Sequence, residues 1–174
     1  MKCIPIAEAI GTEKLRQFIV LARRYCALIE APQPVAPEAF LPEMQQVLAV
    51  LYAAALRLDW IDLQSNVDYE VAKIDLQAIL VIVAEKVGDN RYYWNVFDPT
   101  DMTDEPPVCY DLLDDLGDIY KDLQYSLRVF DLQTADSQEN AVWGFNHDFS
   151  AHWGQHCINA MRALHFFVQK LEKN

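Results

Sequence analysis

Apolar residues recur at helical spacing along most of this chain. The pattern begins after Thr12 with a segment in which one face is apolar: Leu15, Phe18, Ile19, Ala22, Tyr25, Cys26 and Ile29. Thr12 itself can cap this helix. Three prolines in residues 31–37 end it, because proline cannot continue a helix. The first element is therefore predicted as an amphipathic helix with one buried face.

Four further helices are predicted from the same rhythm. They cover about residues 37–58, 68–87, 112–130 and 138–171, the last with a break near Phe149. The helix that ends at Gly88 is apolar on nearly all sides, which indicates a central place in the fold. The short connection at residues 131–137 makes the last two helices an antiparallel hairpin. The predicted fold class is all-α, a single helical bundle of about five helices that forms one domain over residues 1–174.

Two short segments interrupt the helical pattern. Residues 91–97 are rich in aromatic side chains and suit either a short strand or a helical turn, since periodicity cannot decide in so short a run. Residues 98–107 are acidic and bounded by prolines. They lack the glycine and the alternating ligands of an EF-hand, so a solvated loop is expected there.

Charge and cysteine usage exclude several classes of partner. The net charge of −12 would repel a phosphate backbone, so neither nucleic acid nor an anionic membrane is expected as a partner. The longest uncharged apolar stretch, residues 44–56, is too short to span a bilayer, and the N-terminus does not read as a signal peptide. The four cysteines have no C-x-x-C spacing, which predicts free thiols. We therefore expect a soluble, cytoplasmic protein.

Aspartates gather on one border of the helix predicted at residues 112–130. At about 100° per residue, four of them fall along the edge of its apolar arc: Asp111, Asp115, Asp118 and Asp122. Asp111 is placed to cap the helix, and Asp122 beside Lys121 suits a solvated face. Aspartate is a weak helix former, so a merely solvated face would more often carry glutamate. The choice of residue therefore needs a further explanation.

Two histidines stand one turn apart in the last predicted helix. His152 and His156 project from one face about 6 Å apart, with His156 inside the inward arc, whereas His147 and His165 fall on the surface. The hairpin register sets Asp115 opposite residue 153 and Asp118 opposite residue 150. The handedness of the hairpin decides whether these borders of the two helices or the opposite ones face each other. Because a histidine in an apolar arc needs a polar partner, we expect the acidic stripe and the histidine pair to meet. Gly117 and Gly154, which lie on the opposite borders of the two helices, suggest a close helix approach.

Three interpretations of these groups are open. The aspartates form a solvated stripe, or they form a buried hydrogen-bond network with the histidines that fixes the packing. In the third, a divalent metal (Zn, Mn, Fe or Mg) is held by Asp115, Asp118, His152 and His156, since facing helices build such sites from carboxylate and imidazole ligands.

Whether the protein is an enzyme is also open. No nucleophile motif or phosphate-binding loop occurs in the sequence, although a metal held by those residues would suit hydrolysis. The alternative function is a non-enzymatic adaptor or a small-ligand-binding helical protein in which the Asp/His cluster is structural. Substrate, small-molecule ligand and protein partner are not identified by the sequence.

Several motifs carry a family resemblance. The strings DDLGDIYKDL (residues 114–123), HWGQH (152–156), ALHFF (163–167) and RRYCALIE (23–30) are similar to a bacterial family known as domain of unknown function 5063, DUF5063. The resemblance covers most of the chain. It implies an all-helical, cytoplasmic bacterial protein, and it implies no activity and no catalytic residue.

Overall fold

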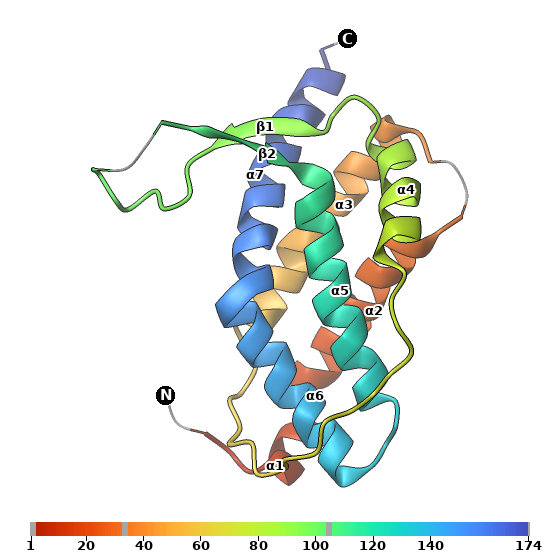
Figure 1. Ribbon diagram of the computed structural model, residues 1–174, viewed down its shortest axis with the longest axis vertical. Coiled ribbons are helices and arrows are strands. Elements are labelled where there is room, and N and C mark those ends of the chain that lie inside the picture. Colours follow the sequence, from red (N-terminus) through yellow and green to blue (C-terminus); the bar gives the residue numbers. More distant parts are fainter. Residues whose placement is uncertain (1–2, 33–34, 104–105, 174) are drawn as a thin grey trace.

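Long helices that lie side by side make up most of the protein (Figure 1), and the computed structural model describes residues 3–32, 35–103 and 106–173. The elements are, in chain order, α1 (Ile6–Ile10), α2 (Glu13–Glu30), α3 (Pro37–Ala55), α4 (Leu76–Val87), β1 (Tyr92–Asn95), β2 (Val108–Asp111), α5 (Leu112–Phe130), α6 (Ala135–Asp148), a π-helical turn (Phe149–Trp153) and α7 (Gly154–Leu171). The all-α class is confirmed, with a small ribbon of two strands added. The expected break near Phe149 is the π-helical turn, through which α6 continues into α7.

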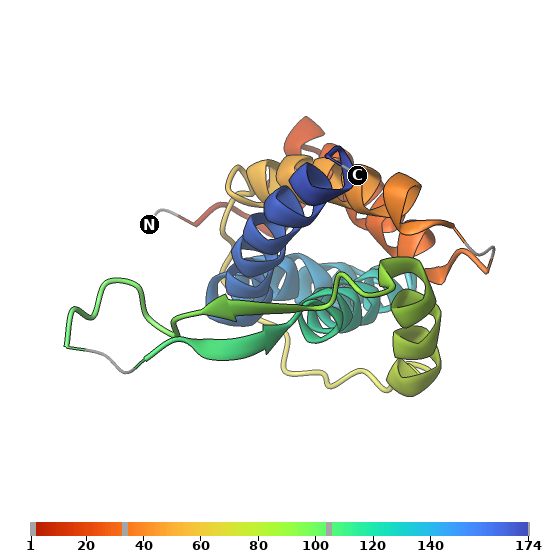
Figure 2. The same ribbon diagram turned by 90° about the horizontal axis from the view of Figure 1, so that it is seen from above.

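The core lies between α2, α3, α5 and the long helix formed by α6 and α7. Trp153, Phe18 and Phe145 are fully or almost fully buried there, and the rings of Phe18 and Phe145 meet edge to face at 5.0 Å. Seen along the bundle, α5 and α7 lie next to each other with the ribbon across them (Figure 2). The predicted antiparallel pairing of the last two long helices is confirmed. No helix in the described part of the chain has the length and apolar character needed to cross a membrane.

The predicted caps and the undecided aromatic segment have clear outcomes. The Thr12 hydroxyl accepts a hydrogen bond from the Leu15 amide at 3.2 Å, so this cap is confirmed. Gly88 follows α4 with a φ of 58°, a conformation that glycine adopts without strain. Residues 91–97 contain strand β1, which pairs antiparallel with β2 in a register that sets Tyr93 opposite Tyr110. The acidic segment 98–107 forms the loop between them, and residues 104–105 of it lie outside the described part.

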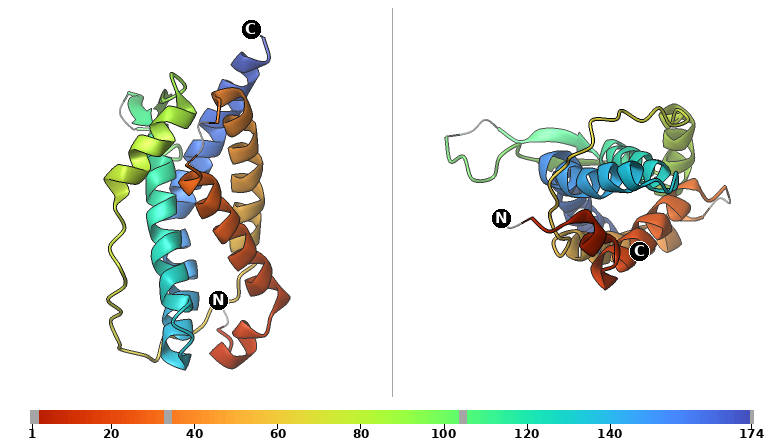
Figure 3. Two further views of the ribbon diagram at one scale, coloured as in Figure 1. Left: turned by 90° about the vertical axis from the view of Figure 1, so that its right-hand side faces the viewer. Right: turned by 90° about the horizontal axis from the view of Figure 1, so that it is seen from below.

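The helix predicted at residues 68–87 begins later than expected. Residues 58–75 are extended and are called the strap below. The strap first crosses the end of the bundle beside α6, and its later part runs along α5 before α4 begins at Leu76 (Figure 3). Side chains of the bundle bind the backbone of the strap: Tyr125 donates to the Tyr69 carbonyl at 3.2 Å, and Arg128 donates to the Ala72 carbonyl. Asp75 then caps α4 by accepting from the Ala78 amide. These tertiary bonds satisfy the backbone of the strap without a helix.

The predicted central position of α4 is wrong. This helix lies at the margin of the bundle against α5, and its Val81 side chain is 62% exposed. A helix of 12 residues buries only one face against its neighbours, however apolar the others are. Near its end, the buried Lys86 ammonium group donates to the carbonyl oxygens of Leu28 and Ile29, at 2.9 and 2.7 Å. It thereby satisfies carbonyl groups that the end of α2 leaves free.

The two helical glycines serve different purposes. A Cβ atom on Gly117 would lie 2.8 Å from a methyl group of Leu80, so this glycine lets α4 approach α5 closely, as its position suggested. Gly154 does not mark the approach of another helix, and that expectation is wrong. A Cβ atom there would press into the carbonyl oxygen of Phe149, five residues earlier in the same helix. The π-helical turn therefore depends on a residue without a side chain at position 154.

We expect Gly154→Ala to destabilise the protein by about 1–3 kcal/mol, because the added methyl group forces the π-helical turn to shift. The matched control is Gly11→Ala. At Gly11 a Cβ atom meets only ordinary contacts of 3.5 Å or more, so this change should be neutral or slightly stabilising. Urea unfolding of both variants measures the difference. Equal effects would contradict the role given to Gly154.

Candidate metal centre

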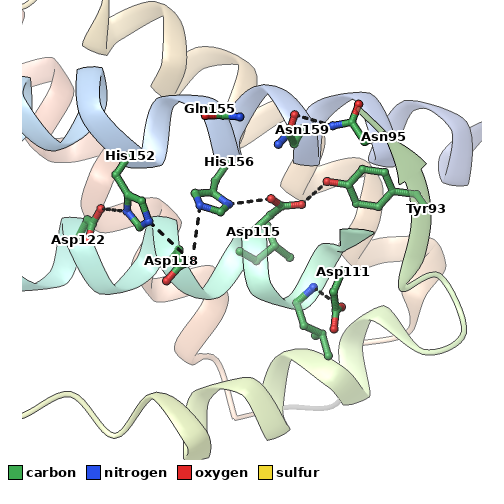
Figure 4. A network of polar contacts seen from close by, with 12 residues as sticks. Tyr93, Asn95, Asp111, Asp115, Asp118, Asp122, His152, Gln155, His156 and Asn159 are labelled. Atoms are coloured by element: carbon green, nitrogen blue, oxygen red, sulfur yellow. Dashed lines mark hydrogen bonds and ion pairs between the residues drawn. The ribbon is translucent and has the colours of Figure 1, made fainter. Parts of the chain in front are cut away.

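Five polar side chains form a continuous line along the seam between α5 and the long helix that contains α7 (Figure 4). These are Asp115, Asp118 and Asp122 on one side and His152 and His156 on the other, called the Asp/His cluster below. The aspartates follow one another at spacings of three and four residues, which places them on a single face of α5. The acidic stripe and the paired imidazoles therefore meet in space, as the hairpin predicted.

Asp115 is the buried end of the cluster. Its side chain is only 2% exposed, and its two oxygens accept separate hydrogen bonds. Nδ1 of His156 donates to one at 2.8 Å, and the hydroxyl of Tyr93 donates to the other. Burial raises the pKa of Asp115, and the hydrogen bonds from His156 and Tyr93 oppose that shift. The two donors therefore compensate in part for taking a carboxylate out of water.

His156 joins this buried end to Asp118. Its Nδ1 is engaged by Asp115, and its Nε2 lies 3.6 Å from Oδ2 of Asp118. The hydrogen bond with Asp115 raises the pKa of His156, while burial acts in the opposite direction. Since a carboxylate accepts, the neutral ring carries its proton on Nδ1 and presents the lone pair of Nε2 to Asp118.

His152 repeats this arrangement one turn away. Its Nδ1 lies 2.7 Å from Oδ2 of Asp122, and its Nε2 lies 4.0 Å from the same Asp118 oxygen that faces His156. The two imidazole rings stand 4.8 Å apart and nearly perpendicular, at 71°. Both Nε2 atoms therefore converge on one carboxylate, with each Nδ1 held by another.

Asp118, His152 and His156 together offer three ligand atoms within 4.8 Å of one another. Two ligand atoms of a tetrahedral ion with bonds of about 2.1 Å stand about 3.4 Å apart, so small side-chain movements would close the set around one ion. Such movements are open to these groups, because 43% of the His152 side chain and 23% of the Asp118 side chain are exposed. The exposure also leaves one side of the set open to water.

The four residues predicted as metal ligands are thus brought together, but in different positions. The carboxylate oxygens of Asp115 are occupied by His156 and Tyr93, whereas Asp118 faces both rings. The register differs from the predicted one by about a turn, since Asp115 meets His156 and not residue 153. The extra residue that a π-helical turn accommodates moves the register in this direction.

Two members of the network were missed by sequence reasoning. Asp122 was placed on a solvated face, yet it holds His152; its spacing from Asp118 carried that signal. Tyr93 had no such signal, because the ribbon brings it to Asp115 from a segment 22 residues earlier. Asp111 caps α5 as predicted, and it also binds the Arg91 guanidinium with an Nε contact of 2.9 Å. That ion pair fixes the start of the ribbon over α5.

Comparison with known proteins assigns a family. The family model described as "Domain of unknown function (DUF5063)" matches residues 10–170, which bears out the resemblance carried by the sequence motifs. The crystal structure of protein BF1032 from Bacteroides fragilis is similar with a TM-score of 0.78 and 21% identity, over 90% of this chain and 93% of that one. A comparison with the curated proteins finds no match. The likeness to BF1032 concerns the fold alone.

We expect His156→Ala to destabilise the metal-free protein by about 1–3 kcal/mol, because it leaves the buried Asp115 without one of its two donors. His165→Ala is the control on the same helix and should stay within about 0.5 kcal/mol, since His165 is exposed. Denaturant unfolding in the presence of a chelator measures both. Equal losses of stability would contradict the buried hydrogen bond.

Tyr93→Phe should cost about 1–2 kcal/mol of stability, because it removes the second donor to Asp115 and keeps the ring. The same change at the neighbouring Tyr92 removes a hydroxyl from a 60% exposed side chain and should be neutral. Thermal unfolding of the pair tests whether the ribbon is tied to Asp115. A neutral Tyr93→Phe variant would show that it is not.

Proposed function

The chain belongs to the DUF5063 family, and we propose that it binds a divalent transition-metal ion through Asp118, His152 and His156. One observation carries the proposal: the Nε2 atoms of both imidazoles face the same Asp118 oxygen. Asp115 and Asp122 hold the Nδ1 atoms of the two rings and orient them. A carboxylate that fixes a histidine from behind is the usual partner of a metal-bound imidazole. We therefore assign Asp115 an orienting role in place of the ligand role expected from sequence.

The distances from Asp118 to the two rings support a bound ion. Its Oδ2 lies 3.6 and 4.0 Å from the two Nε2 atoms, which is longer than a good hydrogen bond. Where the rings are in the neutral Nδ1–H form, the Asp118 oxygen faces two lone pairs, and such an arrangement needs positive charge between them. A metal ion supplies that charge in the geometry the three ligands already approach. A second proton on His156 also supplies charge, and the raised pKa of that ring favours it in the metal-free protein. The rival explanation is that the rings themselves become doubly protonated.

The ligand types narrow the choice of ion. Two imidazoles and one carboxylate suit Zn, Mn or Fe, whereas Mg prefers oxygen ligands and keeps more of its water. Three protein ligands leave at least one position for water, and an ion bound in this way can lower the pKa of that water for hydrolysis. The residues of this chain would hold the ion and orient its ligands.

The proposal includes a cytoplasmic location and no nucleic-acid partner. The four cysteines are free thiols, and this supports a reducing compartment such as the cytoplasm. The net charge of −12 supports the expectation that nucleic acid is not a partner. The same negative charge raises the local concentration of cations near the Asp/His cluster.

Thermal melting with and without metal tests the proposal. Chelator-treated protein should be stabilised by Zn, Mn or Fe and not by Mg. An ion that binds the native state and is present at about 100 times its dissociation constant adds about 2.7 kcal/mol to the free energy of unfolding. For a chain of this size, that corresponds to a rise in melting temperature of about 5–11 °C. Elemental analysis of protein purified without chelator should find the same ion.

Matched variants separate the metal site from the structural network. Asp118→Asn should abolish the shift with little change in metal-free stability, because Asp118 makes no short hydrogen bond within the cluster. Asp122→Asn should weaken binding by about 10–100-fold, as expected for a group that orients a ligand. His165→Ala should change nothing. Absence of a shift with every ion, or a shift that survives Asp118→Asn, would rule out this site.

A further inference from the structure

Two recesses lie beneath the strap, beside the Asp/His cluster. The larger has a volume of about 640 Å³ and is walled by strap residues and by α5, with apolar side chains Val71, Ile74 and Leu76 among its lining. The smaller has a volume of about 180 Å³ and lies against α6 near Trp143 and Gly144. A recess of the larger size can hold a small organic molecule.

Three residues line both recesses: Tyr69 of the strap, Tyr125 of α5 and Asp148 at the end of α6. The hydroxyl of Tyr125 donates to the Tyr69 carbonyl, which fixes its ring beside the strap. Among the residues that the structure describes, none makes a hydrogen bond or an ion pair with the Asp148 carboxylate. A partly buried carboxylate without a partner therefore stands at the junction with two phenol rings.

The lysines of the larger recess do not occupy this junction. Lys73 and Lys121 are exposed, and neither forms an ion pair with the partly buried Asp148 in the described structure. Three charged groups act on the pKa of Asp148: Asp122 raises it, and His147 and His152 lower it. Burial and the nearby Asp122 raise the pKa of Asp148 to about 6, as expected for an acid that lacks a cationic partner. The two histidines offset only part of this shift, so in the described part of the chain the Asp148 carboxylate has room for a closer cationic partner.

We propose that this junction binds the ammonium group of a small organic amine whose apolar body lies in the larger recess. A carboxylate supplies the ion pair, and phenol rings attract a cation through their faces. The apolar strap residues cover the hydrocarbon part, whose transfer from water supplies affinity. The proposal does not depend on the metal, because none of the three junction residues is a proposed ligand.

The amine would nevertheless lie next to the proposed ion. Asp122 lines the larger recess and also holds Nδ1 of His152, so one side chain separates the two sites. The strap is the natural entrance, since its backbone is tied to the bundle by a few side-chain bonds. Binding of the amine is therefore measured first in chelator, where failure of the metal proposal has no influence on it.

The test adds three small molecules of similar shape to isotope-labelled protein in the presence of a chelator. These are phenethylamine, its neutral analogue 2-phenylethanol and the anionic 3-phenylpropionate. The pH is kept above the pKa of Asp148, so that this carboxylate is ionised. Amide signals of the strap and of α6 around Gly144 should shift with phenethylamine at millimolar concentration. The alcohol should bind at least about tenfold more weakly, and the acid should not bind. Equal binding of the three probes, or no binding of the amine, would overturn the proposal.

Variants test the junction itself. Asp148→Asn should weaken phenethylamine binding by about tenfold or more, while Asp136→Asn, an exposed acid on the same helix, should leave it unchanged. Tyr69→Leu keeps an apolar side chain on the strap and removes a ring, so it should also weaken phenethylamine binding. This variant tests the junction if Asp148→Asn does not fold. Unchanged affinity in either junction variant, or signal shifts confined to another face, would contradict the site.

Discussion

The burial of the Asp115 carboxylate is the constraint on which the rest of the structure depends. A charge withdrawn from water is costly unless partners surround it, and the penalty is several kcal/mol for an ion left alone. Two donors meet this demand, His156 from the helix partner and Tyr93 from the ribbon. Together they set the register of α5 against α7, place the ribbon over both helices and fix which nitrogen of His156 carries the proton. The direction of Nε2 toward Asp118 follows from that choice.

The π-helical turn shapes the helix backbone so that both histidines reach their aspartate partners. His152 belongs to this turn, and Gly154 follows it where a side chain would strike the Phe149 carbonyl. Such turns are frequent at functional sites, where an extra residue redirects side chains. In this protein the turn sets His152 against Asp122 while His156 faces Asp115. Each imidazole therefore has a carboxylate at its Nδ1, and the Nε2 atoms of both face the same carboxylate, that of Asp118.

Periodicity was enough to predict the long helices and their antiparallel hairpin, because apolar spacing determines which face is buried. The meeting of the aspartates with His152 and His156 needed a further argument, that a histidine on a buried face requires a polar partner. It could not predict the strap, whose backbone is satisfied by tertiary partners such as Tyr125. It also misplaced α4, since an apolar surface does not reveal how many neighbours cover it. Tyr93 reaches Asp115 only through the fold of the ribbon. Which carboxylates face the metal position and which hold the imidazoles likewise depends on distances of a few ångströms. The spacing of residues along the sequence does not determine these distances.

The tautomers of His152 and His156 provide the most direct test of the central claim. Long-range nitrogen–proton NMR of the chelator-treated protein, at a pH where both rings are neutral, distinguishes protonated from unprotonated ring nitrogens. The account predicts that both rings carry the proton on Nδ1, and that the Nε2 signals of both rings move when the stabilising ion is added. A proton on Nε2 of either ring in the metal-free protein, with Nε2 signals that do not respond to any ion, would contradict it.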